Sequence, residues 1–66
     1  VDGLTQDVNS LGTTVNSNKT DIANNTASIT TNVDNITQNA ANINALNTAV
    51  DGLTQDVNSL GTTVNS

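Results

Sequence analysis

The chain has 66 residues and a net charge of −5, from six Asp and one Lys, and it holds no aromatic residue, no Cys and no His. This composition excludes an ordinary hydrophobic core, and it disfavours binding to nucleic acid or to an anionic membrane, both of which need clustered Lys or Arg. Without Cys or His, zinc sites and thiol or imidazole catalysis are excluded. We therefore expect no enzyme, no catalytic residue, no metal, no cofactor and no membrane insertion by this segment.

A seven-residue repeat runs along the whole chain. With Val1 placed at position a of a heptad lettered a to g, every a position up to Val64 is Val or Ile. Of the sixteen Val, Ile and Leu residues, fifteen occupy a or d, and only Val33, at e, does not. An apolar spacing of about 3.5 residues held this long predicts helices that supercoil left-handedly about one another. The predicted fold is therefore all-α, a single continuous helix in a coiled coil.

The first predicted element, residues 1–17, carries leucine at d, and it recurs letter for letter at residues 50–66. The offset between the two copies is seven whole heptads, so both copies keep the same register. This identity indicates a recent duplication, an array of one cassette, or a sequence designed to begin and end alike. We predict one coiled-coil segment over residues 1–66, with two Leu-layered repeats and no linker.

The predicted centre, residues 18–45, replaces leucine at d by asparagine. The four d residues are Asn18, Asn25, Asn32 and Asn39. The β-branched a residues around them are Val15, Ile22, Ile29, Ile36 and Ile43. We predict that the four amides point to a shared axis between rings of Val and Ile from sister chains.

The number of strands is predicted from the core and its flanks. β-branched a with Leu d is typical of parallel dimers. The flanks indicate a third strand, because e and g are mostly small and uncharged and no g residue faces an oppositely charged e residue. Three d-site amides can also point at one axial point. We predict a parallel homotrimer with two identical chains as partners, in which helix formation depends on association.

This pattern resembles the stalks of trimeric autotransporter adhesins, the YadA-like surface fibres of Gram-negative bacteria. The motif I-x-x-N-T of that family appears once, at residues 22–26, so Thr26 is the expected support of the Asn25 layer. The other layers keep the asparagine but have Lys19, Val33 or Ala40 in place of the threonine. The resemblance implies a stalk outside the outer membrane and chloride-like anions on the trimer axis. It also implies that a head domain beyond these residues binds the host ligand.

Two alternatives stay open for what the asparagine layers bind, and two for their role. Three amides turned inward present N–H donors without an acceptor, and on sequence alone water and a small anion fit equally well. The layers either fix register and strand number or weaken the core, so that association waits until after export.

Two alternatives to the adhesin stalk stay open. A trimeric phage tail-fibre shaft needs a similar long rod of similar composition, and flanking sequence would distinguish it from an adhesin. A rod whose own Asn/Thr/Ser surface binds host ligands would bind host matrix in isolation.

Overall fold

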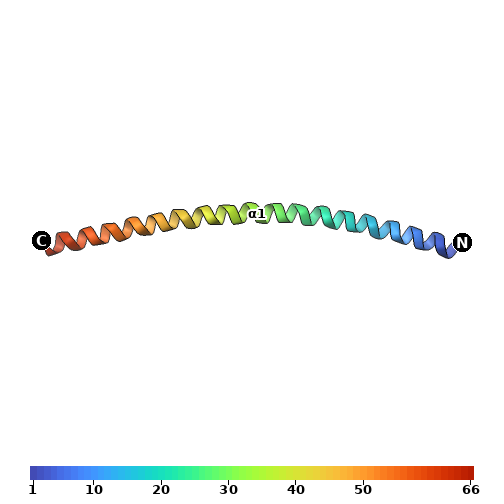
Figure 1. Ribbon diagram of the computed structural model, residues 1–66, viewed down its shortest axis with the longest axis horizontal. Helices are drawn as coiled ribbons and strands as arrows, with labels where there is room; N and C mark the ends of the chain where they lie inside the picture. The colour runs from blue at the N-terminus through green and yellow to red at the C-terminus, as the bar shows by residue number, and fades with distance from the viewer. The chain divides into compact units, whose positions relative to one another are not determined.

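The computed structural model describes residues 1–66, and its one regular element is helix α1, Asp2–Asn65 (Figure 1). The prediction of a single continuous all-α element is confirmed. No proline interrupts the helix, and no residue, glycine included, has a positive φ angle. The four glycines are therefore accommodated inside the helix, although each costs about 1 kcal/mol against alanine there.

Both ends of α1 have their own backbone hydrogen bonds. The amide of Thr5 donates to the carbonyl of Val1 at 2.9 Å, and Asp2 places a carboxylate in the first turn, where the helix dipole favours negative charge. At the other end the backbone N–H of Ser66 donates to Thr62 at 3.1 Å and to Thr63 at 3.3 Å. The Ser66 hydroxyl adds a bond of 2.9 Å to Thr62. These bonds use carbonyls that a helix terminus otherwise leaves unpaired.

Nine of the twelve threonine hydroxyls of α1 are bonded to the helix itself. Each of the nine donates to the backbone carbonyl four residues earlier, at 2.8 to 3.2 Å. A threonine hydroxyl can also bond to the backbone in non-helical conformations, which disfavours the helix. Here these hydroxyls bond to carbonyls of the helix while it keeps its regular form. The residues concerned are Thr5, Thr13, Thr20, Thr26, Thr30, Thr48, Thr54, Thr62 and Thr63.

By their contacts the residues divide into two halves, Val1–Val33 and Asp34–Ser66. In neither half is any residue buried, and residues distant in sequence do not come into contact. Apart from Val1, the large apolar side chains are between 53% and 75% exposed. Most of the stability of a protein helix comes from packing of its apolar face. In the single chain the apolar side chains of α1 are all left uncovered.

Candidate functional site

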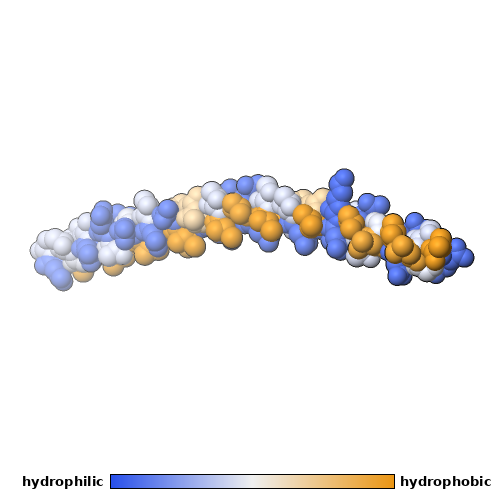
Figure 2. Space-filling view, turned by 45° about the vertical axis from the view of Figure 1, so that its right-hand side comes forward, coloured by the Kyte–Doolittle hydropathy of each residue, from blue (hydrophilic) through white to orange (hydrophobic).

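The predicted site residues occupy one face of the helix in each half. In Val1–Val33 the amides of Asn18, Asn25 and Asn32 alternate with β-branched a residues, and in Asp34–Ser66 Asn39 stands between Ile36 and Ile43. Residues seven apart are nearly two full turns apart, so they share a face. In Figure 2 hydrophobic side chains follow one another along the helix, with hydrophilic side chains among them. The structure thus places amides and apolar side chains together, as the spacing predicts.

The four amides have no partner within their own chain. None of the side-chain hydrogen bonds of α1 involves Asn18, Asn25, Asn32 or Asn39. Each amide keeps two N–H donors and one carbonyl acceptor. Because buried polar groups are costly unless they are paired, these amides need partners from outside the chain once the apolar face is covered.

Thr26 makes the Asn25 layer chemically different from the other three. Its hydroxyl donates to the carbonyl of Ile22 at 2.8 Å, the shortest side-chain bond of the helix. A hydroxyl has one donor and two lone pairs, so the oxygen of Thr26 is left as an acceptor. It can take an N–H from an amide but cannot donate to the amide carbonyl.

No carboxylate occupies an a or d position. The six Asp residues occupy positions b, f and g, at residues 2, 7, 21, 34, 51 and 56. One of them, Asp21, lies three residues after Asn18 and four before Asn25, so it borders these two amides on the helix surface. The only side-chain cation, Lys19, directly follows Asn18 in sequence. The a and d positions themselves therefore carry only neutral amides and apolar side chains, with one charge of each sign, Lys19 and Asp21, beside Asn18.

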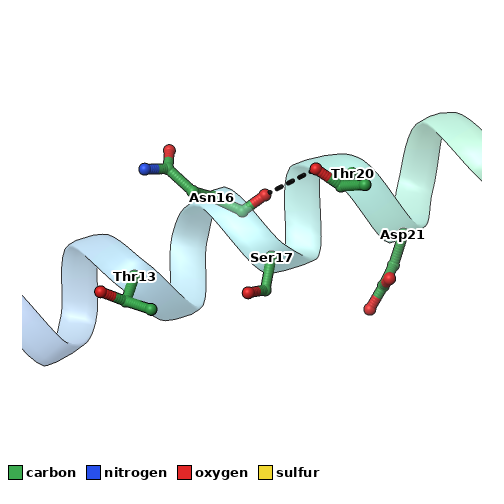
Figure 3. Close-up of a pocket in the computed structure, with 5 residues that line it drawn as sticks. All are labelled: Thr13, Asn16, Ser17, Thr20 and Asp21. Carbon is green, nitrogen blue, oxygen red and sulfur yellow. Dashed lines mark hydrogen bonds between the residues drawn. The ribbon is translucent and has the colours of Figure 1, made fainter.

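An open hollow of the helix surface lies elsewhere, lined by Thr13, Asn16, Ser17, Thr20 and Asp21 (Figure 3). These residues belong to the outer positions b, c, f and g, and none is a predicted site residue. Within the hollow the Thr20 hydroxyl donates to the Asn16 carbonyl at 3.2 Å. No motif in the sequence marks this hollow. With one charged group and no enclosing wall, it has the character of a hydrated groove between successive turns.

No three His, Cys, Asp or Glu side chains gather into a group that could hold a metal ion. No part of α1 is both long and apolar enough to cross a bilayer. The chain matches no protein-family model, no curated protein and no solved structure.

Proposed function

We propose that residues 1–66 are a segment of a parallel, left-handed homotrimeric coiled-coil stalk that acts as a spacer in a bacterial surface adhesin. The observation that carries this proposal is the division of α1 into two chemistries. Val, Ile, Leu and four unpaired amides share the a and d positions, and every carboxylate lies outside them. A face of this kind is covered by identical faces, because like layers then meet along the whole length.

The outer surface supports a spacer rather than an enzyme or a receptor. Most of its threonine hydroxyls are bonded to the backbone, and the hollow lined by Thr13, Asn16, Ser17, Thr20 and Asp21 is open. Such a surface stays hydrated and gives neighbouring molecules few anchors of the aromatic or arginine kind that dominate binding interfaces. Each added residue lengthens a helix by about 1.5 Å, so the number of heptads in a stalk of this kind would set its distance from the cell.

The asparagine layers of this trimer would hold chloride-like anions on the axis. Three copies bring three amides to each layer, and N–H groups turned inward offer only positive partial charge to the centre. The surrounding Val and Ile side chains exclude water, which leaves the attraction weakly screened. For the Asn25 layer, the oxygen of Thr26 can accept one N–H of a neighbouring amide, which leaves the other N–H to point inward.

Sedimentation equilibrium of the unmodified chain tests the strand number, because one chain has a mass of 6.7 kDa and a trimer has three times that mass. A limiting mass of one or two chains at high concentration would overturn the trimer. Crystals grown in bromide test the anions independently. Anomalous peaks on the threefold axis at Asn18, Asn25, Asn32 and Asn39 are expected. Ordered water in their place would remove the anions and leave the stalk.

Localisation is tested in the cells that make the protein. An antibody raised against residues 18–45 is expected to label intact cells, and protease added outside is expected to remove the epitope. An epitope protected until the cells are lysed would overturn a cell-surface stalk.

A further inference from the structure

The d positions of α1 form three blocks in chain order. Leucine occupies the first two d positions, asparagine the next four, and leucine the last three. We call the middle set the asparagine block: Asn18, Asn25, Asn32 and Asn39. Its boundaries are sharp, since Leu11 precedes it and Leu46 follows it by one heptad each. All of these residues belong to one helix and are exposed in the single chain, so they are available to a second copy.

An axial shift between parallel copies mixes the two kinds of layer. Without a shift, every d residue meets its own kind. A shift of one heptad places Leu11 beside Asn18 and Asn39 beside Leu46, which makes two mixed layers. Shifts of two to four heptads mix more layers, and longer shifts leave fewer than half of the layers overlapping.

A mixed layer is unfavourable because an amide then faces leucine side chains that offer no hydrogen-bond partner. The a positions do not discriminate in this way. A shift of one heptad there exchanges only Val for Ile, at Val15 with Ile22 and at Ile43 with Val50, a difference of one methylene group.

The flanks oppose the unshifted alignment only weakly. Lys19 at e faces Thr14 at g without a shift. A shift of one heptad brings Lys19 opposite Asp7 or Asp21. An exposed ion pair of this kind contributes at most about 1 kcal/mol, less than the cost of unpaired amides in two mixed layers.

We propose that the asparagine block is a register key: it selects, as the partner of this chain, a second copy aligned without axial shift. The proposal rests on the parallel association described under the proposed function. The amides select the alignment because a shifted chain places them against leucine at the two boundaries of the block. This holds whether an anion or water occupies the axis.

Only shifts of seven or more heptads meet no opposition from the key, and the repeat defines the shortest of them. A shift of 49 residues, from Val1 to Val50, brings residues 1–17 against their identical copy at residues 50–66. Leu4 then meets Leu53 and Leu11 meets Leu60, with no mixed layer. Only 17 residues overlap in that arrangement, so the unshifted alignment is favoured by its far larger buried surface.

A shifted key of unchanged composition tests the proposal. The double substitution Asn18→Leu and Leu46→Asn moves the asparagine block by one heptad toward the C-terminus. Among arrangements in which more than half of the layers overlap, a native chain and a shifted-key chain now have no mixed layer only when they are displaced by seven residues. Native residue 53 then lies beside residue 60 of the shifted-key chain.

Single cysteines read the alignment as disulfides. A native-key chain carrying Leu53→Cys is mixed with a shifted-key chain carrying either Leu60→Cys or Leu53→Cys, refolded together and oxidised in a glutathione buffer. Mass spectrometry quantifies the disulfides between the two kinds of chain. The Leu60→Cys partner is expected to give about tenfold more of this product, given the cost of unpaired amides in two mixed layers. Equal yields, or an excess with the Leu53→Cys partner, would overturn the register key.

Native-key chains alone provide the control. Disulfides between two Leu53→Cys chains are expected to exceed those between Leu53→Cys and Leu60→Cys chains by a similar factor. If native Leu53→Cys chains form no disulfide with one another, the parallel association itself fails. If they do form it while the shifted key leaves the alignment unshifted, only the register key fails. Sedimentation equilibrium of each mixture verifies that the strand number is unchanged.

Discussion

The hydroxyl of Thr26 donates a 2.8 Å hydrogen bond to the backbone carbonyl of Ile22, one turn earlier on α1. This bond engages the one donor of the hydroxyl and leaves its oxygen as an acceptor next to Asn25 in sequence. In a parallel assembly position e of one chain flanks the d residue of its neighbour. Thr26 is therefore placed to orient a neighbouring Asn25 amide through an N–H···O bond.

Replacing Thr26 by Val, a side chain of similar shape without an acceptor, is expected to weaken anion binding at the Asn25 layer. The loss is estimated at about 1 kcal/mol per chain, the usual net contribution of one hydrogen bond. The measurement is the height of the anomalous bromide peak at that layer relative to the peak at Asn18. Thr26→Ser keeps the hydroxyl and is expected to keep the peak ratio, so a ratio that falls equally in both variants would refute this role.

Val33→Thr is the reciprocal change, because Val33 follows Asn32 as Thr26 follows Asn25. The new hydroxyl is expected to bond to the carbonyl of Ile29, as the Thr26 hydroxyl bonds to that of Ile22. We expect a stronger bromide peak at the Asn32 layer, of the same order as at Asn25. Val33→Ala removes apolar bulk without adding an acceptor and serves as the control; an equal gain there would show that space and not hydrogen bonding decides occupancy.

Glycine-to-alanine substitution is expected to stabilise the helix by about 0.5–1 kcal/mol per site. A Cβ atom added at Gly3 or Gly12 meets nothing within 4 Å in the single chain. Gly3 stands at c, far from the seam of a coiled coil, whereas Gly12 stands at e beside it. Chemical denaturation of the two variants compares these positions. If Gly12→Ala gains less than Gly3→Ala, the helices approach closely at Gly12; equal gains show that both glycines face solvent in the assembly.

Salt is expected to strengthen association, because three chains of −5 each bring a charge of −15 together. The Debye length falls from about 30 Å at 0.01 M to about 10 Å at 0.1 M salt, which screens this repulsion. Thermal unfolding followed by circular dichroism is expected to shift upward with both sodium fluoride and sodium bromide.

The difference in melting temperature between sodium bromide and sodium fluoride separates anion binding from general charge screening. Bromide is expected to raise the melting temperature of the native chain more than fluoride at equal concentration. In a chain with isoleucine at all four positions of the asparagine block, the two salts are expected to act alike. A bromide advantage that survives in this variant would place the anions elsewhere than the asparagine layers.

The sequence was sufficient to predict the secondary structure. Val or Ile at every a position, Leu or Asn at d and the absence of proline indicated one helix, and α1 extends from Asp2 to Asn65 as that spacing requires. The same spacing placed Asn25 on a face with Ile22 and Ile29, because residues three, four and seven apart share one side of a helix. These are local, periodic properties, so they can be read from the order of residues.

The pairing of the polar side chains needed coordinates. Asparagine and threonine both compete for backbone hydrogen bonds, and no sequence rule told which of them do so here. The structure distinguishes them: the Thr26 hydroxyl is bonded to its own helix, whereas the Asn25 amide is not. The hydroxyl sits on Cβ and reaches the carbonyl four residues back, but the amide extends one atom further from the backbone. The side-chain conformations in the structure therefore show that the Asn25 amide, and not the Thr26 hydroxyl, keeps its donors free for a partner.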